Sequence, residues 1–565
     1  MAKAILDTQR YAGQGLMDVR RLKLECSIAD RKKAVMPLGV SPVKGGGYTY
    51  PPDEVVVLVL KHLFGDELEM TPEAEHWFNE KQRQARVLVE AAIAKDAKVD
   101  LPYAEVMKPY QRVAVDFARK AKRCIIADDR GLGKTFEALA ATDTPRSNQV
   151  LIVAPGYLKY GWEREIQKWT NYMGLVAEGD RKVREAIIRN KGVEYLIVNY
   201  EMIRESTKVG GYPELLKENW DAVIFDEAHR LKGRDSQWTH GAKKLQTDML
   251  LMLTGNPIAN RPDEVWQLLN LIDPRKFTSY WAFVEYYCNV VDTFFGKEIV
   301  GVNKAHLAQL QFTLQPYMIR RMKADVAPWL PEKIDHYIEV DLTGKQKSFY
   351  KRIEKDMVIE LADGGMQVID SIVAQSIRLQ QALANPAILD GPKESVVENT
   401  AIELVSDLLD SGEGKVIVGT WFKPAAMLFK ERLEKKKIKS FVITGDIANY
   451  KRDKIVQGFK ECKDPCVLIG TIKAMSEGIN VDECDNIVFM DKSWVPLDNE
   501  QLQDRIHRMT STRTKNYYHI VVRDSISMDR EETLQEKTDL IDEVLSMRAV
   551  AQKLVQRYQE NPLKS

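Results

Sequence analysis

The sequence predicts an α/β protein with two doubly wound lobes, in which each parallel sheet is covered by helices on both faces. Short aliphatic runs recur along the chain, and each is followed by a turn and a helix-like pattern. Runs such as VLIVAP and AVIFDE do not alternate polar with apolar residues. Strands that are apolar on both faces are typical of parallel sheets buried between helices. Strand–helix repetition in two separate sets therefore indicates two such lobes.

The predicted strands fall on either side of a long helix-rich stretch. Those of the first lobe are Cys124–Ala127, Val150–Ala154, Tyr195–Val198, Ala222–Phe225 and Leu250–Thr254. Those of the second lobe are Val416–Thr420, Phe441–Thr444, Val467–Gly470, Ile487–Met490 and Tyr518–Val522. The stretch between them contains segments such as EVWQLLNLI and no set of strand-like runs.

This pattern divides the chain into regions that we expect to be separate. They are a small N-terminal accessory region at 1–105, a first lobe at 106–260, helical insertions with the inter-lobe connection at 261–410, a second lobe at 411–528, and a helical C-terminal tail at 529–565. Within the accessory region, Glu73–Lys95 has a helix-like pattern.

Composition excludes several classes of protein. Of 565 residues, 44% are hydrophobic and 29% charged, which is ordinary for globular proteins and excludes collagen-like, disordered and coiled-coil chains. Because 82 basic residues balance 82 acidic ones, any nucleic-acid groove must be local. The cysteines form no CxxC pair, which favours a reducing compartment. No signal peptide or membrane-spanning run is visible, so we expect a soluble cytoplasmic protein.

A phosphate-binding loop is predicted where DDRGLGKT follows the strand CIIA and precedes the helix-forming FEALAA. Gly131 and Gly133 let backbone N–H groups turn inward around a phosphate, and Lys134 places a cation on its β and γ oxygens. The Thr135 hydroxyl stands where Mg²⁺ would be held. Asp128 occupies the position at which the strict pattern has glycine. The plain alternative is a glycine-rich turn that only caps a helix.

The sequence DEAH follows the apolar strand AVIF, at the strand edge that faces the ligand crevice of a parallel sheet. Asp226 can hold Mg²⁺, directly or through water, and Glu227 can polarise the attacking water as a general base. The alternative is an acidic helix start, because carboxylates favour that position anyway. Together with the phosphate loop upstream, the pair predicts ATP hydrolysis.

In the second lobe, QLQDRIHR follows the strand IVFM and a proline-containing loop. Arg505 and Arg508 lie three residues apart, so on a helix they would share one face. A γ-phosphate held by the first lobe would be a suitable anion for them, and catalysis would then depend on lobe closure. The alternative is a solvated basic face.

These motifs resemble those of superfamily-two helicase-like ATPases, and among them the Swi/Snf-like (sucrose-non-fermenting) branch, over about Lys108 to Ile541. The opening segment KPYQRVAVDFA, the DNA-strand motif VLIVAPGYLKYGWEREIQKW, the coupling motif LTGNPIAN and the second-lobe motif GTIKAMSEGINV all resemble family motifs. RRMKADV, followed by Leu330-Pro331, is particularly characteristic of the branch.

The resemblance implies two tandem RecA-like lobes that use ATP and Mg²⁺ to move along duplex or branched DNA. It implies a catalytic set of Lys134, Asp226, Glu227, Arg505 and Arg508, with Thr135 and Asp226 at the metal. Gln111 would read adenine. The nucleotide-contacting set that it implies is Gln111, Arg112, Asp128, Gly131, Leu132, Gly133, Lys134, Thr135, Gly478, Asn480 and Gln501.

DNA contacts are expected on basic residues near the loops that follow strands. The candidates are Lys159, Arg164, Lys232, Arg234, Lys473 and Arg513. Contacts with phosphates would give sequence-independent, salt-sensitive binding. Each residue taken alone is more often a solvated surface charge.

The chain departs from the family pattern at some positions. Met475 and Ser476 stand where glycines are usual, Thr510 and Ser511 replace Gly-Gln, and Asn256 and Ala259 replace Thr and Gln. These changes bear on DNA contacts and on coupling, and leave the groups assigned to ATP chemistry in place.

Other functions stay open at this point. The chain could be a strand-separating or annealing helicase on DNA or RNA, or a nucleotide-gated DNA-binding scaffold with residual ATPase. Residues 1–105 faintly resemble the small module ahead of the ATPase in annealing-type members, and they are candidates for binding protein partners. A bacterial or phage origin is expected, with the nucleus as the location if the protein is eukaryotic.

Overall fold

The computed structural model describes residues 2–11, 17–27, 30, 41–42, 48–50, 54–144, 149–190, 192–255, 257, 263–293, 296–363, 377–476, 479, 481–493, 496–508, 511–528 and 531. Over these residues the chain forms two compact units. The first comprises Met1–Asp129 and Gly133–Met322, and the second comprises Arg130–Leu132 and Lys323–Leu540. The predicted helical tail at 529–565 lies outside the described residues, apart from Glu531.

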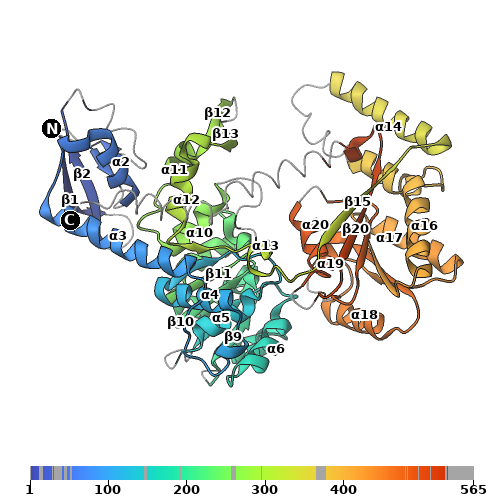
Figure 1. Ribbon diagram of the computed structural model, residues 1–565, viewed down its shortest axis with the longest axis horizontal. Coiled ribbons are helices and arrows are strands. Elements are labelled where there is room, and N and C mark those ends of the chain that lie inside the picture. The colour runs from blue at the N-terminus through green and yellow to red at the C-terminus, as the bar shows by residue number, and fades with distance from the viewer. Residues whose placement is uncertain are drawn as a thin grey trace. The chain divides into compact units, whose positions relative to one another are not determined.

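The first unit begins with a small module built on a 5-stranded sheet in the order β3-β4-β2-β1-β5 (Figure 1). Its strands are β1 (Ala2–Tyr11), β2 (Met17–Glu25), β3 (Ser41–Pro42), β4 (Tyr48–Tyr50) and β5 (Leu68–Met70). Its helices are α2 (Glu54–Phe64) and α3 (Pro72–Ile93). Leu22, Leu24, Leu60 and Phe78 share one core there. The long helix α3 then reaches the next core, which includes Ala91.

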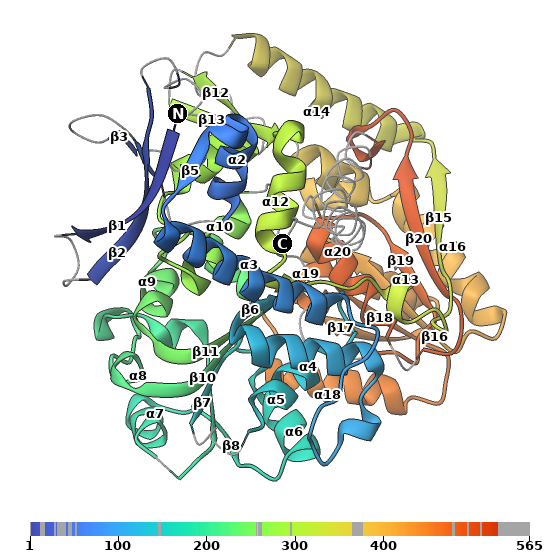
Figure 2. The same cartoon turned by 60° about the vertical axis from the view of Figure 1, so that its left-hand side comes forward.

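The main sheet of the first unit has 7 parallel strands in the order β14-β6-β11-β10-β7-β9-β8. They are β6 (Arg123–Ile126), β7 (Val150–Val153), β8 (Gly174–Val176), β9 (Tyr195–Val198), β10 (Asn219–Asp226), β11 (Gln246–Leu253) and β14 (Met318–Ile319). The sheet packs with α4 (Pro109–Ala121), α5 (Lys134–Thr142) and α6 (Lys159–Trp169), and α7 (Arg181–Ile188) follows β8 (Figure 2). Every strand predicted for this lobe is confirmed; the short β8 and β14 were missed.

The expectation that residues 261–410 contain no strands is wrong. Beside α10 (Glu264–Ile272), α11 (Tyr280–Tyr287) and α12 (Leu307–Leu314), the segment holds the antiparallel hairpin β12 (Cys288–Thr293) and β13 (Gly296–Val302). It also supplies β14 to the first sheet and β15 (Lys333–Val340) to the second. β15 alternates exposed and half-buried residues, as an edge strand does, so it lacks the continuous apolar run expected of a central parallel strand.

The second unit has a 6-stranded parallel sheet in the order β15-β20-β19-β16-β18-β17. The other strands are β16 (Lys415–Thr420), β17 (Lys439–Ile443), β18 (Cys466–Thr471), β19 (Asn486–Phe489) and β20 (Lys515–Val522). The helices are α14 (Gly344–Asp363), α16 (Val396–Asp410), α17 (Lys423–Lys435), α18 (Asn449–Glu461), α19 (Ile472–Ser476) and α20 (Pro496–Gln503).

Alternate residues of the central strand β16 enter separate cores in this unit. Val416 and Val418 pack with α16 and α17, whereas Ile417 packs with α18 and α19. A parallel sheet with a core on each face is the doubly wound arrangement that the sequence predicted, so the predicted fold class is confirmed. Among the described helices, none is long and apolar enough to cross a membrane.

Candidate active site

The predicted phosphate loop and the DEAH segment follow two strands of the first sheet, β6 and β10, that both pair with β11. β11 lies between β6 and β10, and all of them run parallel. The phosphate loop leaves β6, the DEAH segment leaves β10, and Thr254 follows β11. Because the carboxyl ends of parallel strands share one edge, the sheet brings these chain segments together where ligands of such folds bind.

The phosphate loop has the backbone that its glycines predict. Gly131 and Gly133 have φ of 82° and 94°, a left-handed conformation that favours glycine. Lys134 Nζ donates to the carbonyl oxygens of Asp128 at 2.6 Å and Asp129 at 3.2 Å, so the ammonium group is held by the loop itself. Lys134 is the first residue of α5, which places the helix N-terminus beside its charge.

The remaining loop residues differ in their exposure. Leu132 and Asp128 are fully buried, so Asp128 is not a surface carboxylate. Thr135 is half-buried in the first turn of α5, the position expected for a hydroxyl that meets Mg²⁺.

Gln111 lies against the phosphate loop. Its Oε1 accepts a hydrogen bond from the backbone N–H of Lys108 at 3.0 Å. Its Nε2 lies 2.5 Å from the point that a Cβ on residue 133 would occupy, so the Gln111 side chain would have to shift if residue 133 carried a side chain. The neighbouring Arg112 instead forms a bidentate pair with Asp96 at 2.8 and 2.7 Å, and this pair would have to open before Arg112 could contact a nucleotide.

The DEAH carboxylates are half-buried and adjacent in the chain. Asp226 Oδ2 accepts a hydrogen bond from Trp162 Nε1 at 2.8 Å, and its Oδ1 accepts one from the backbone N–H of Glu227 at 2.9 Å. Burial and the adjacent Glu227 carboxylate raise the pKa of Asp226 to about 6. The role of Trp162 was missed, although the motif YGWEREIQKW contains it.

Glu227 adopts a left-handed conformation with φ of 51°, which is uncommon for a residue with a side chain and is typical of functional sites. Its Oε2 lies 3.2 Å from Nδ1 of His229. The same Nδ1 lies 3.4 Å from Oγ1 of the buried Thr254. The contacts among Glu227, His229 and Thr254 thus join the ends of β10 and β11. The sequence had not predicted a role in the site for His229 or Thr254.

The site fits Mg²⁺ that arrives with a nucleotide. A carboxylate whose pKa is raised by burial and by a neighbouring carboxylate is stabilised by a nearby cation. Mg²⁺ usually takes one or two protein carboxylates and completes its shell with water and phosphate oxygens. Asp226 and Thr135 can supply such ligands, and no group of three metal-ligating side chains occurs among the described residues.

A second charged cluster surrounds the phosphate loop in the first unit. Arg321 donates to both carboxylate oxygens of Asp128 and lies 3.4 Å from Glu137 Oε1. Burial, and then the Asp128 carboxylate, raise the pKa of Glu137 well above its ordinary value. Sequence reasoning missed these contacts because they join residues far apart in the chain.

In the second unit, Arg505 and Arg508 both donate to one backbone segment. Arg505 Nη2 donates to the Ser476 carbonyl at 2.5 Å, and Arg508 Nη2 donates to the Ile479 carbonyl at 3.2 Å. The expectation of a helical face is wrong, since α20 ends at Gln503 and the arginines lie in the turn that follows. The turn still presents both guanidinium groups to the same segment.

Other predicted residues of the second unit lie near the arginine turn or outside the described residues. Ser511 Oγ accepts a hydrogen bond from the backbone N–H of Arg508 at 2.9 Å, so one departure from the family pattern supports the arginine turn. Gln501 is buried in α20. Gly478, Asn480 and the departures at 256, 259 and 510 lie outside the described residues.

The predicted DNA-binding residues have different surroundings. Lys159 is only 3% exposed and its amine pairs with Glu178, so the structure does not support a phosphate contact there. Arg513, in contrast, is largely exposed although it pairs with Asp485 at 2.6 Å. Arg164 and Lys473 are exposed.

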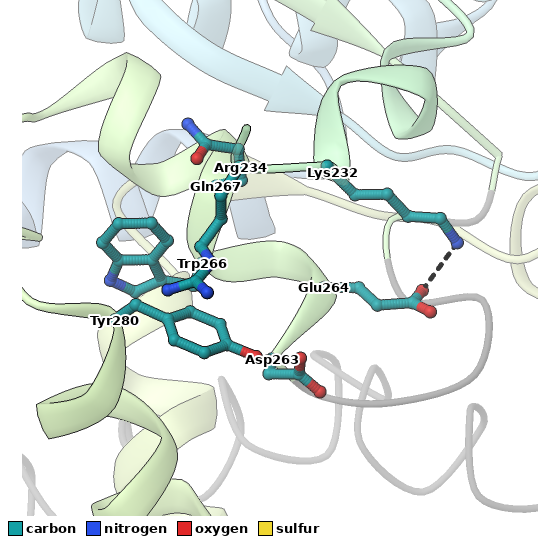
Figure 3. A pocket seen from close by; sticks show the side chains of 8 residues that line it. Lys232, Arg234, Asp263, Glu264, Trp266, Gln267 and Tyr280 are labelled. Atoms are coloured by element: carbon teal, nitrogen blue, oxygen red, sulfur yellow. Dashed lines mark hydrogen bonds and ion pairs between the residues drawn. The ribbon is translucent and has the colours of Figure 1, made fainter. Parts of the chain in front are cut away.

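Lys232 and Arg234 line a pocket of about 280 Å³ in the first unit (Figure 3). Lys232 Nζ lies 3.2 Å from Glu264 Oε2, and Arg234 stacks 3.9 Å above the ring of Tyr280. The Tyr280 hydroxyl donates to Asp263 at 2.6 Å. Two carboxylates therefore balance the two cations, and the pocket is not a basic groove.

The fold and this strand edge define a class of protein, the two-lobed helicase-like ATPases. Comparison with known families gives two matches, a SNF2-related domain over residues 68–388 and a helicase conserved C-terminal domain over residues 400–510. The chain belongs to the SNF2-related family. The predicted family and the predicted class, an ATP-hydrolysing enzyme, are confirmed by these matches.

Relatives occur in animals and bacteria. Mouse chromodomain-helicase-DNA-binding protein 6 is 26% identical over 449 residues, which cover 72% of this chain and 16% of that protein. An uncharacterized ATP-dependent helicase of Mycoplasma genitalium is 26% identical over 451 residues, which cover 78% of this chain and 42% of that protein. The chain thus spans less than half of the length of either relative.

The chain is also similar to a solved structure, the Sulfolobus solfataricus SWI2/SNF2 ATPase core in complex with dsDNA. It is 21% identical, with a TM-score of 0.37, and the match covers 79% of this chain and 93% of that one.

Proposed function

We propose that this protein is a DNA-dependent ATPase that translocates on duplex DNA and remodels DNA or protein–DNA complexes. The observation that carries the proposal is the shared strand edge of the first unit, where Lys134 and the Asp226–Glu227 pair follow β6 and β10, the two strands that flank β11 in one parallel sheet. Membership of the SNF2-related family supports the same function.

Each residue of the first unit has a distinct part in this reaction. The backbone N–H groups of the phosphate loop and the Lys134 ammonium group bind the β and γ phosphates. Asp226 and Thr135 hold Mg²⁺, which neutralises charge on the phosphates. Glu227 accepts a proton from the attacking water, and His229 orients the Glu227 carboxylate at 3.2 Å.

The second unit supplies positive charge for hydrolysis. During turnover, Arg505 and Arg508 exchange their carbonyl partners for the γ-phosphate and stabilise the charge that develops on it. A guanidinium group that is already satisfied by backbone oxygens is not left as a buried, unpaired cation between cycles. Closure of the two units would then couple hydrolysis to movement on DNA.

DNA binding rests on family membership and on exposed basic residues. Arg164, Lys473 and Arg513 are the predicted contacts whose side chains reach solvent. Contacts of this kind with phosphates are independent of sequence and weaken with salt. Residues 1–105 are proposed as the site of protein partners, and a location in the bacterial cytoplasm stays a prediction.

The decisive test is ATPase activity measured without nucleic acid and with single-stranded, duplex and forked DNA and RNA. Stimulation by duplex DNA, together with triplex displacement but no strand displacement, is the expected result. Strand displacement would favour an unwinding helicase. ATP turnover that no nucleic acid stimulates would contradict the proposal and favour a nucleotide-gated scaffold.

A further inference from the structure

Arg321 lies beside the phosphate loop, and its side chain is 11% exposed. It is the second arginine of RRMKADV and follows β14, which pairs with β6. Its Nε donates to Asp128 Oδ1 at 3.0 Å, its Nη2 donates to Asp128 Oδ2, and its Nη1 donates to the carbonyl of Tyr110. The backbone N–H of Arg321 also donates to Asp128 Oδ1, at 3.0 Å.

Through Asp128, Arg321 is connected to the group that binds phosphate. The carbonyl oxygen of Asp128 accepts the 2.6 Å hydrogen bond from Lys134 Nζ. The backbone N–H of Asp129 donates to the carbonyl of Arg321 at 3.0 Å. Arg321 also reaches Glu137 on α5, so it contacts residues on both sides of the loop. A bidentate guanidinium–carboxylate pair fixes orientation as well as distance.

Two residues further on, Lys323 makes the corresponding contact within the second unit. Its Nζ donates to Asp504 Oδ1 at 2.6 Å and to the carbonyl of His507 at 3.1 Å. Lys333 Nζ reaches the same Asp504 oxygen at 3.2 Å. Asp504 directly precedes Arg505, so the lysines hold the turn that carries the arginines.

The boundary between the two units falls between Met322 and Lys323. One short segment of chain therefore carries a cation into each unit, and each cation ends on a carboxylate next to a group assigned to ATP chemistry. The partner of Arg321 is Asp128, at the phosphate loop, and the partner of Lys323 is Asp504, at the arginine turn.

We propose that the RRMKADV segment is a two-ended anchor, in which Arg321 is a positioning residue for the phosphate loop and Lys323 a positioning residue for the arginine turn. The inference rests on the proposed ATPase function and assigns residues that would tune it. Arg130 of the phosphate loop also lies 3.7 Å from Asp504, but the two ends hold different carboxylates, and we expect them to affect different kinetic constants. Loss of the Arg321 contact weakens nucleotide binding, whereas loss of the Lys323 contact slows hydrolysis of bound ATP.

Arg321→Met tests the first end, with Arg123→Met as a matched control. Arg123 is a half-buried arginine of the same unit, at the opposite end of β6, and it donates to three backbone carbonyls at 2.9 Å. We expect Arg321→Met to raise the KM for ATP about 10-fold or more. It should also reduce the rise in unfolding temperature that a given concentration of Mg²⁺ and ADP produces.

Arg123→Met should lower the unfolding temperature but keep the nucleotide-induced rise and the KM. Equal changes of KM in the two variants, or an unchanged KM in Arg321→Met, would overturn the positioning role.

A milder pair of variants keeps the test valid if Arg321→Met does not fold. Arg321→Lys retains the charge but loses the planar fork. Asp128→Asn removes the acceptor charge. If the two residues act as a unit, the double variant binds Mg²⁺–ADP no more weakly than the weaker single variant. Affinity losses that simply add in the double variant would overturn the coupling.

Lys323→Met tests the second end, with Lys333→Met as its control. Lys333 is the more distant and more exposed partner of the same carboxylate, so its removal should have the smaller effect. We expect Lys323→Met to lower kcat about 10-fold with little change in KM. Restoration of kcat by Lys323→Arg would support the role, and a fall in affinity with unchanged kcat would overturn it.

Wild-type measurements separate this inference from the proposed function. Absence of ATP turnover in the wild-type protein, with or without DNA, would refute the proposed function itself. In that case the rise in unfolding temperature with Mg²⁺ and ADP still reports whether Arg321 positions the phosphate loop.

Discussion

The nucleotide edge of the first unit and the arginine turn of the second hold their charges in different ways. In the first unit, Arg321 forms an ion pair with the buried Asp128, whose carbonyl oxygen in turn accepts a hydrogen bond from Lys134. In the second unit, Arg505 and Arg508 donate to backbone carbonyls of the segment around Ser476 and Ile479. Breaking a buried ion pair costs several kcal/mol, whereas a neutral carbonyl is exchanged for a phosphate at a net gain. We therefore propose that the pair of Arg321 with Asp128 stays in place during turnover, whereas Arg505 and Arg508 change partners.

The largest expected effect on ATP turnover comes from the nucleotide edge of the first unit. Lys134→Ala and Glu227→Gln should each lower ATP turnover about 10³-fold, because they remove a phosphate-binding cation and the general base. Unfolding temperature close to that of the wild type is the control for folding. Turnover that persists in either variant would refute the assignment of this edge as the site of hydrolysis.

The arginine turn should show a different pattern. Arg508→Ala is expected to lower ATP turnover about 10²-fold or more while leaving ATP affinity nearly unchanged, because the arginine acts on charge that develops during hydrolysis. Equilibrium binding of ATP in the presence of Mg²⁺ measures the affinity. Lost affinity with normal turnover of bound ATP would show that the turn binds substrate and does not act in the reaction.

A smaller effect is expected from the contacts among Glu227, His229 and Thr254, which join the ends of β10 and β11. Thr254→Val removes the hydroxyl that lies 3.4 Å from His229. We expect stimulation by duplex DNA to fall about 5-fold, with a smaller change in turnover without DNA, because a buried polar network loses one member. Thr142→Val is a matched control, since Thr142 is equally buried in α5 and, among the described residues, its hydroxyl bonds carbonyls of its own helix and the Tyr195 hydroxyl. Equal effects in the two variants would contradict a coupling role.

The smallest effect concerns the stability of the second unit. Burial lowers the pKa of His507 to about 4, and the nearby Lys333 and Lys323 act in the same direction, while the Pro331 carbonyl and Asp504 oppose them. The folded protein therefore favours the neutral imidazole, and this stabilisation is present above about pH 6.5 and is lost as the pH falls toward 4.

Between about pH 6.5 and about pH 4.5 the free energy of unfolding should fall by about 2 kcal/mol more in the wild type than in His507→Gln. Denaturant unfolding across this range measures the difference. If the free energy of unfolding changes with pH in the same way in the two proteins, the lowered pKa of His507 would be contradicted.

The two lobes and the core of the nucleotide site could be predicted from the sequence because their signals are local. Continuous apolar runs identify buried parallel strands, and the glycines and lysine of the phosphate loop lie within a few residues of each other. β14 was missed because it has only 2 residues, and β15 because an edge strand alternates. The pairing of Arg321 with Asp128 joins residues 193 positions apart, which no local pattern reveals.

The burial of Lys159 illustrates the same limit. Its position after a strand predicts a surface contact with DNA, but Glu178 holds the amine inside the first unit. The charge of a residue type can be read from the sequence, whereas the presence of a partner depends on the tertiary fold.

The central claim is that Lys134 and Glu227 of the first unit act on the same phosphate as Arg505 and Arg508 of the second. The most direct measurement compares binding of Mg²⁺–ADP, with and without aluminium fluoride as a mimic of the transferring phosphoryl group, in the wild type and in a variant with both arginines changed to alanine. The account predicts that the wild type binds the mimic much more tightly than ADP alone and that the double variant loses this difference while keeping its affinity for ADP. A double variant that retains the full preference for the mimic would contradict the account.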